Sequence, residues 1–268
     1  MLGLHLEPTV IPAGTRVPWS HDDLLIVCGQ YFTLPFGQMH ARNPRVIELA
    51  RLLGRTPSSV AMKLVNLASL DPAHQARGIK GLANHTRADE AIWRDFQTNW
   101  NQMSLASETK FEELTARERA VAAGGALPVA PSDAVTEIKR AVVVRTMQTF
   151  FRKVIMAAYN STCCITGNPV PDLLIASHIL PWSEFPEQRL NPRNGLCLAA
   201  HFDRAFDRGL ITLDAQMRLV LSPALRRYLP NDALGSEFVR REGQPLAHPD
   251  RFAPDPQFIA HHRTVIFR

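Results

Sequence analysis

The chain has 268 residues, which is long enough for two domains of ordinary size, each with its own core. A hydrophobic content of 46% and a charged content of 21% are typical of a soluble globular protein. The formal charge of +5 comes from 30 Lys and Arg against 25 Asp and Glu, with arginine well in excess of lysine. Arginine suits bidentate phosphate contacts, so a polyanionic partner is compatible with this charge but not required by it.

Cysteine spacing and hydropathy argue against several classes of protein. Cys28, Cys163, Cys164 and Cys197 form no Cys-x-x-Cys pair, so a four-cysteine zinc site of the usual spacing is not expected. The sequence shows no secretory signal pattern and no apolar window approaching the roughly 18 residues of a membrane span. We therefore expect a cytoplasmic protein with free thiols and no membrane partner.

Two helices are predicted near the N-terminus. Asn43, followed by proline, favours a helix start, and apolar residues recur at helical spacing up to Gly54. A second helix is expected to start after Thr56 and to stop at Asp71, which again precedes proline. Two helices joined by a four-residue turn with glycine have the spacing of a helix-turn-helix motif.

The outer face of the second helix would present Ser59, Lys63 and Asn66, with Arg55 in the preceding turn. Short hydrogen-bonding side chains and cations of this kind suit the major groove of DNA. The alternative is a small helical bundle whose polar face is only solvated. We treat residues 1–103 as a helical, helix-turn-helix-like domain that would bind DNA.

The middle of the chain predicts a linker. A charged run at 108–119 precedes Ala-Gly-Gly-Ala and two prolines, so we expect a helix that fades into a linker over 104–131. A second domain would cover 132–268. Its first helix carries cations on one side, among them Arg145 and Arg152, which could hold a DNA backbone; a solvated face is the alternative.

Residues 163–214 combine short elements with chemically active side chains. A strand-like run at 173–176 leads directly into His178, and Asn194 with the following glycine predicts a turn. A second short strand follows at 196–198, then a helical pattern at 200–208. The unit is therefore a strand, a long turn, a strand and a helix.

This arrangement suits the hydrolysis of a phosphodiester. A histidine whose pKa is near neutrality, such as His178, can take a proton from water. Asp203 and Asp207 are four residues apart, so they share a helix face and can bind one divalent cation. Asn194, at the turn, can bridge backbone groups and hold the histidine loop in place.

Four motifs in this segment resemble those of HNH endonucleases of the ββα-metal class. They are Cys164-Ile165-Thr166-Gly167, Ala176-Ser177-His178-Ile179-Leu180-Pro181-Trp182, Asn194-Gly195-Leu196-Cys197-Leu198 and Phe206-Asp207-Arg208-Gly209. The resemblance covers roughly 140–215, and His262-Arg263 with Phe267 resembles a closing family motif. It implies cleavage of double-stranded DNA with a divalent metal, Mg²⁺ first and Mn²⁺, Ni²⁺ or Zn²⁺ as alternatives, often in restriction or phage defence.

The resemblance also implies roles for individual residues. His178 matches the general base, and Asn194 matches the central asparagine, which shapes the site. Asp203 matches the metal-holding helix position, with Asp207 as a second ligand. His201 stands two residues short of the usual ligand position, so it is an alternative ligand, a catalytic histidine or a phosphate contact.

Two departures from the plainest family pattern leave alternatives open. Ser177 stands where many members have an acidic or histidine ligand before the base, and His201 is displaced. Arg204 is one of several arginines around the motif that could bind phosphate; surface charge is the default for each.

We therefore expect an α+β, mostly helical protein with an N-terminal helix-turn-helix-like domain and a C-terminal ββα-metal nuclease domain. The alternatives are a DNA-binding protein with a degenerate, inactive HNH fold and an RNA-directed nuclease. A homodimer would suit a palindromic target but is not required. The sequence leaves open the recognition site, methylation dependence, nicking against double-strand cleavage, and which of His201, Asp203 and Asp207 binds the metal.

Overall fold

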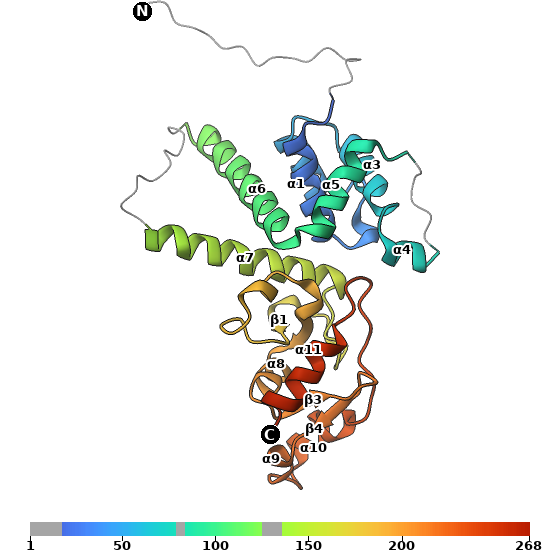
Figure 1. Ribbon diagram of the computed structural model, residues 1–268, viewed down its shortest axis with the longest axis vertical. Coiled ribbons are helices and arrows are strands. Elements are labelled where there is room, and N and C mark those ends of the chain that lie inside the picture. The colour runs from blue at the N-terminus through green and yellow to red at the C-terminus, as the bar shows by residue number, and fades with distance from the viewer. Residues whose placement is uncertain (1–17, 79–83, 125–135) are drawn as a thin grey trace, which may run out of the picture.

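The computed structural model describes residues 18–78, 84–124 and 136–268, which form a helical part, a connecting helix and a C-terminal α+β part (Figure 1). The helical part contains α1 (His21–Phe32), η1 (Phe36–Gln38), α2 (Pro44–Leu52), α3 (Pro57–Ala68), α4 (Pro72–Ala76), α5 (Arg87–Thr98) and α6 (Trp100–Ala122). The connecting helix α7 (Thr136–Ala158) lies between the two parts (Figure 1). Residues 1–17 of the expected DNA-binding domain lie outside the described residues.

The C-terminal part is built on two short antiparallel strand pairs and several short helices. Its elements are η2 (Pro171–Leu173), β1 (Leu174–His178), η3 (Pro186–Gln188), η4 (Pro192–Asn194), β2 (Gly195–Ala199), α8 (Ala200–Asp207), β3 (Ile211–Leu213), β4 (Leu219–Leu221), α9 (Pro223–Arg226), α10 (Asp232–Glu237), η5 (Val239–Arg241), α11 (Pro256–His261) and the π-helical turn η6 (His262–Ile266). The expectation of a mostly helical α+β fold is confirmed.

Local sequence signals explain where α2 and α3 begin. The Asn43 side chain accepts a hydrogen bond from the backbone N–H of Arg45, and the Thr56 side chain accepts one from Ser59. Each cap is followed by proline in the first helical turn, where the missing N–H costs nothing. The structure thus contains the predicted helix pair, with α2 and α3 packed against each other.

The expected linker over 104–131 differs from the structure in its first part. Residues 104–122 continue α6, which contacts both α1 and α7. Glu108, the first residue of the charged run, is fully buried, pairs with Lys153 of α7 and accepts a hydrogen bond from Gln30. Residues 104–122 are thus helical, and the partners of this charged run lie far away in sequence. A linker between two domains over 104–131 remains a proposal. Residues 125–131 lie outside the described residues.

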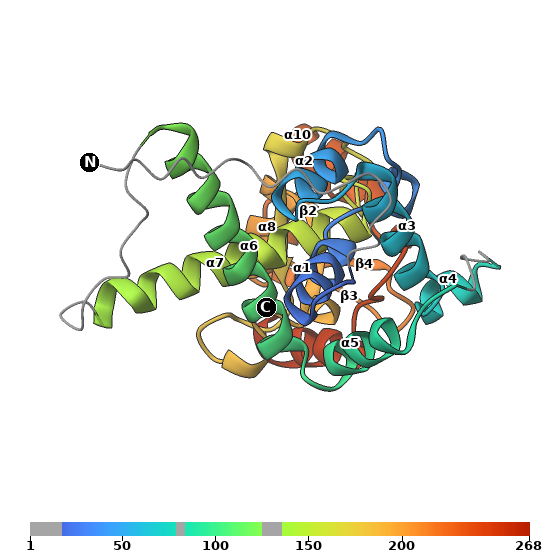
Figure 2. The same cartoon turned by 90° about the horizontal axis from the view of Figure 1, so that it is seen from above.

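The helical and C-terminal parts share one continuous apolar core. Arg251, which is 3% exposed, donates hydrogen bonds to the backbone oxygens of Tyr31 and Leu34 at 3.3 and 2.7 Å. The Phe252 ring contacts Phe32, with ring centroids 5.8 Å apart. Both parts therefore stabilise each other, and the boundaries at 103 and 132 remain a proposal. Figure 2 shows α6 and α7 projecting together to one side of this body.

The nuclease-like segment is a small sheet covered by α7 and α8. β1 and β2 pair antiparallel, with His178 opposite Gly195, and α8 follows β2 directly. Helix α7 contacts both strands. A Cβ at Gly195 would lie 2.3 Å from the Ile155 side chain, so only glycine lets α7 approach the strand this closely. This approach places α7 against the end of β1 that carries His178.

The C-terminal segment closes the module. Gly209, directly after α8, has a φ of +65°, and a Cβ there would lie 2.0 Å from the backbone oxygen of Ile266. The backbone N–H of Arg268 donates to the Gly209 carbonyl at 3.0 Å. Within the described ranges, no helix combines the length and the hydropathy needed to cross a membrane.

Candidate active site

The last residue of β1, His178, is held by the loop that connects β1 to β2. Its Nε2 lies 3.0 Å from the backbone oxygen of Arg189. A carbonyl oxygen can only accept, so Nε2 carries the hydrogen and the neutral ring keeps its lone pair on Nδ1. The fold therefore prepares Nδ1 to accept a proton.

Aromatic side chains surround the His178 ring. Phe151 of α7 stacks on it with ring centroids 3.8 Å apart and planes 13° apart, and Trp182 meets it edge-on at 5.3 Å. Burial lowers the pKa of His178, and the hydrogen bond to the Arg189 carbonyl offsets part of this decrease. His178 is therefore unprotonated at neutral pH, as a general base must be.

Asn194 ties together the two ends of the loop between β1 and β2. This residue is 1% exposed, and its side-chain oxygen accepts a hydrogen bond from the Leu180 N–H at 2.7 Å. Its side-chain nitrogen donates to the backbone oxygens of Gln188 and Leu180 at 3.2 and 3.4 Å. The residue makes the backbone bridges expected of it at this turn.

Asp203 and Asp207 of α8 line the same pocket as His178, which has a volume of about 470 Å³. Burial raises the pKa of both carboxyl groups, and the charge of Asp203 raises that of Asp207 further. The charge of Arg204 offsets part of the increase for both carboxyl groups, and that of Arg208 offsets part of it for Asp207, but both pKa values remain raised. Two carboxylates that repel each other in a partly buried pocket gain from binding a cation.

The Ser177 hydroxyl adds a third oxygen to this pocket. It is buried, lines the pocket and makes no hydrogen bond of standard geometry with any residue the structure describes. It is close enough to Asp203 to lower the pKa of that carboxyl. A buried hydroxyl without a well-formed hydrogen bond is costly, and an additional oxygen-binding ligand in the pocket would offset this cost.

These three oxygen groups fit a hard divalent cation such as Mg²⁺ or Mn²⁺. Across 18–78, 84–124 and 136–268, no group of three or more Asp, Glu, His and Cys residues is arranged to hold a metal ion. Asp203 and Asp207 would therefore be the charged ligands, and the remaining positions would fall to neutral oxygens from the protein, water or substrate. A cation held this way would stabilise negative charge on a phosphate.

The structure places His201 outside the pocket. Its side chain is 52% exposed, its Nε2 lies 3.2 Å from Glu237 of α10, and its ring contacts Phe202 and Phe238. Two residues along a helix correspond to roughly 200° of rotation, so His201 and Asp203 face opposite sides of α8. The expectation that His201 acts in catalysis or binds the metal therefore does not match its position.

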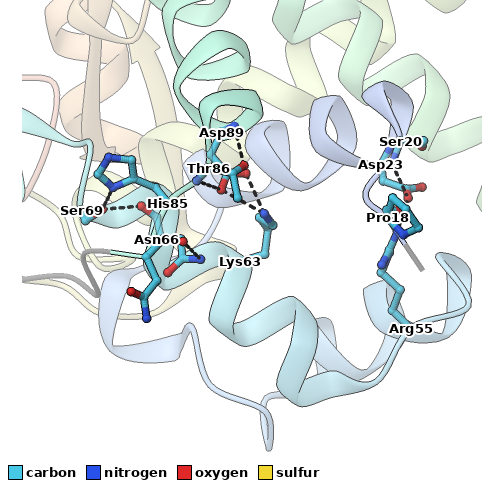
Figure 3. Close-up of polar contacts among 11 residues, drawn as sticks. Pro18, Ser20, Asp23, Arg55, Lys63, Asn66, Ser69, His85, Thr86 and Asp89 are labelled. Carbon is cyan, nitrogen blue, oxygen red and sulfur yellow. Dashed lines mark hydrogen bonds and ion pairs between the residues drawn. The ribbon is translucent and has the colours of Figure 1, made fainter. Parts of the chain in front are cut away.

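Two of the three residues expected on the DNA-reading face of α3, Lys63 and Asn66, are buried. Lys63 is 5% exposed, and its Nζ lies 2.8 and 3.0 Å from the two carboxylate oxygens of the fully buried Asp89 (Figure 3). Asn66 is also buried and donates to the Asn84 backbone oxygen at 3.3 Å (Figure 3). Their role as DNA contacts is corrected, because α5 and the segment before it cover this face.

The other two candidates beside α3 are engaged locally. Arg55 donates to the Pro18 backbone oxygen and to Asp23, both at 2.7 Å (Figure 3). Its guanidinium lies 3.8 Å from the centre of the Trp19 ring. Ser59 is half-buried in the first turn of α3, where its N–H donates to the Thr56 cap. The structure therefore gives Arg55 a role in anchoring the chain before α1.

The three C-terminal arginine candidates differ in their environment. Arg152 donates to the backbone oxygens of Leu174 and Pro171 at 2.7 and 3.1 Å, so it fixes the start of β1. Arg145 is exposed on α7. Arg204 is exposed at the pocket, and the equally exposed Arg208 lines it as well. Only Arg204 of the three proposed phosphate contacts lies next to the pocket.

The C-terminal His262 also lines the pocket. Its Nε2 donates to the Phe206 backbone oxygen at 3.0 Å, its Nδ1 lies 2.9 Å from the Thr212 hydroxyl, and its ring stacks on Phe206. Burial lowers the pKa of His262 to about 4, so it stays neutral. Both ring nitrogens are used, which assigns His262 to fixing α8 rather than to proton transfer. The similarity of His262-Arg263 to a closing motif was the sequence signal for it.

Comparison with known proteins agrees with this geometry. Residues 163–214 match the family model described as HNH endonuclease. No curated protein matches the chain. The matched residues include β1, β2 and α8, and with them His178, Asn194, Asp203 and Asp207. A domain of this family indicates nuclease activity. The segment 163–214, which supplies most of the pocket lining, therefore matches the HNH endonuclease family.

Proposed function

We propose that the protein is a metal-dependent endonuclease that hydrolyses phosphodiester bonds of double-stranded DNA. One observation carries the proposal: His178, with its lone pair on Nδ1, lines the same pocket as the two carboxylates of Asp203 and Asp207. A general base and a cation-binding pair are the two components that this reaction requires from the protein. Most residues that line the pocket lie inside the matched family segment, and His262 and Ile266 lie outside it.

In the proposed reaction, Nδ1 of His178 accepts a proton from a water molecule. The water oxygen forms a bond to phosphorus while the bond from phosphorus to the leaving 3′ oxygen breaks, and the leaving oxygen takes up a proton from solvent. The lowered pKa of His178 keeps the ring ready for this transfer. Asn194 holds the loop whose Arg189 carbonyl fixes the tautomer.

Asp203 and Asp207 would hold the divalent cation, with the Ser177 hydroxyl beside them. When bound, the cation would supply electrostatic stabilisation of the phosphate and of the leaving oxygen. Oxygen ligands favour Mg²⁺, with Mn²⁺, Ni²⁺ and Zn²⁺ as the alternatives to test. Arg204 and Arg208, exposed at the pocket, are placed to bind a neighbouring phosphate.

The test is cleavage of a supercoiled plasmid by the wild-type protein in each of these cations and in EDTA. We expect nicked or linear product with Mg²⁺ or Mn²⁺ and none in EDTA. An intact plasmid under all of these conditions, on both methylated and unmethylated DNA, would exclude the nuclease and leave the DNA-binding alternative. Parallel incubation with structured RNA tests the RNA-directed alternative, which requires faster cleavage of RNA than of DNA.

The family resemblance also suggests a biological setting for the protein. We propose a role in restriction or phage defence, in the cytoplasm, from the family resemblance alone. Plating efficiency of phage on cells that express the wild-type protein, compared with a His178→Ala variant, tests this role. A homodimer is proposed only for a palindromic target, and light scattering of the protein with and without DNA measures it.

A further inference from the structure

We propose that Trp100 and Asn101, at the start of α6 in the helical part, are positioning residues for the catalytic histidine. They would act through the loop 179–194, which connects β1 to β2. This inference rests on the proposed function, because it concerns the same His178. It also gives the helical part a role in catalysis that does not depend on reading DNA.

The helical part reaches this loop through two side-chain donors. Trp100 Nε1 donates to the Leu190 backbone oxygen at 2.6 Å, and Asn101 Nδ2 donates to the Glu187 backbone oxygen at 2.7 Å. Both donors come from the first turn of α6, some ninety residues away in sequence. Each bond fixes the orientation of one peptide plane of the loop.

The nuclease segment binds the two carbonyls in between. Asn194 Nδ2 donates to the Gln188 oxygen at 3.2 Å, and His178 Nε2 donates to the Arg189 oxygen at 3.0 Å. Four consecutive carbonyls, 187–190, are therefore each bound by a different side chain. The outer two are held by the helical part and the inner two by the nuclease segment. The carbonyl that fixes the His178 tautomer lies between two that are fixed in turn.

Trp100 is itself firmly held. Its ring lies 4.8 Å from Phe32, 5.4 Å from Phe252 and 6.0 Å from Phe96, measured between centroids. A donor that is already ordered loses little entropy when it binds, so its hydrogen bond restrains the acceptor effectively. The Leu190 carbonyl is thus anchored to the shared core.

The loop also makes contacts with its own residues and with the segment before α11. Arg189 Nε donates to the Trp182 backbone oxygen at 2.9 Å. The N–H of Asp255, which caps α11, donates to the Arg193 oxygen at 3.0 Å. These bonds hold the beginning and end of the loop. Without Trp100 and Asn101, the Glu187 and Leu190 carbonyls would lose their side-chain donors, whereas the local bonds of Gln188 and Arg189 would remain. The Arg189 carbonyl would then lie between two carbonyls without side-chain donors, and its peptide plane would gain freedom to rotate.

The decisive variants remove a donor with little change in shape. Trp100→Phe keeps an aromatic ring in the core but loses Nε1–H, and Asn101→Asp keeps the size but replaces the donor with an acceptor. Gln102→Ala is the matched control. Gln102 lies in the same turn of α6, and it lines the groove between α6 and the loop together with Trp100 and Asn101. It is exposed and makes no side-chain hydrogen bond within the described ranges. Asn101→Gln is the conservative variant that can restore the bond.

In plasmid cleavage we expect Trp100→Phe to lower kcat about 10-fold with KM within about 2-fold, because misplacing a catalytic group slows the chemical step rather than binding. Asn101→Asp should lower kcat by a smaller factor, again with little change in KM. Asn101→Gln should recover part of the lost kcat, and Gln102→Ala should match the wild type. Unchanged kcat in both Trp100→Phe and Asn101→Asp, in folded protein, would overturn the proposal.

A second readout does not depend on cleavage. Nitrogen-15 NMR of the imidazole rings reports which nitrogen of His178 carries the proton, once the signal is assigned by its loss in His178→Ala. We expect one tautomer, protonated at Nε2, in the wild type and a mixture in Trp100→Phe. An unchanged single tautomer in both donor variants would contradict the proposal. A mixture in a protein that cuts no nucleic acid would support it while refuting the proposed function. Should Trp100→Phe fail to fold, Asn101→Asp carries both tests.

Discussion

Helices α3 and α8 both carry polar side chains at helical spacing, yet only α8 presents them to a pocket. In α3 the Lys63 ammonium is enclosed with the Asp89 carboxylate from α5. In α8 the Asp203 and Asp207 carboxylates line a pocket and form no ion pair with any residue the structure describes. Polar spacing alone therefore does not identify a binding face; what separates the two helices is whether a partner within the chain already satisfies the charge.

The charged residues of α3 and α8 affect the stability of the fold in different ways. Removing one partner of a buried ion pair such as Lys63 with Asp89 destabilises the fold, because the other charge is left buried and unpaired. Carboxylates that repel each other, as in α8, cost stability unless a ligand offsets the repulsion. Substitutions in α3 should therefore affect folding, and substitutions in α8 should affect metal binding and cleavage.

The largest expected effect comes from the double variant Asp203→Asn and Asp207→Asn. Loss of both charged ligands should abolish Mn²⁺ binding measured by calorimetry and lower the cleavage rate by about 10³-fold or more. Thermal stability without metal should stay equal or increase, because the repulsion is gone. A variant that still binds Mn²⁺ as tightly as the wild type would show that the two carboxylates are not the ligands.

Substitution of Lys63 tests whether the polar residues of α3 serve the fold rather than DNA binding. Lys63→Met leaves the buried Asp89 carboxylate without its partner and should lower the free energy of unfolding by about 3 kcal/mol. Chemical denaturation measures this loss. The matched control is Ser58→Ala, at an exposed position of the same helix. Reduced DNA affinity in a fully stable Lys63→Met protein would instead restore α3 as a reading helix.

The pH dependence of cleavage should separate the base from the carboxylates. Activity requires a neutral His178, and burial lowers the pKa of this residue. The ring therefore stays neutral at the pH where an ordinary histidine titrates, and it becomes protonated only at lower pH. The pKa values of Asp203 and Asp207 are raised, so falling pH should release the metal earlier than for ordinary carboxylates. Cleavage should therefore be steady above neutrality and fall steeply in acid, and higher Mn²⁺ should shift that fall to lower pH. A rate that increases as pH falls would contradict this assignment.

The sequence predicted the elements that depend on local signals. Caps and prolines mark the starts of α2 and α3, and hydrophobic runs with the Asn-Gly turn indicate the order of β1, turn, β2 and α8. His178, Asn194, Asp203 and Asp207 all lie where that order expected them.

What the sequence could not predict are contacts between distant segments. The partner of Lys63 is 26 residues away, and the donor to the Leu190 carbonyl is 90 residues away. His201 was a candidate because its residue type completes the family name, whereas the turn of α8 points it at Glu237. Neither a buried partner nor the direction of a helix face can be inferred from spacing until the surrounding elements are placed.

The most direct test of the central claim compares His178, which lines the pocket, with His201, which lies outside it. His178→Ala and His201→Ala are assayed side by side for plasmid cleavage in Mg²⁺, after both variants are shown to be folded. We expect His178→Ala to lose about 10³-fold in rate, since a general base contributes about 10²–10⁴-fold, and His201→Ala to stay within about 2-fold of the wild type. Equal activity of His178→Ala and wild type, or a loss confined to His201→Ala, would contradict the account.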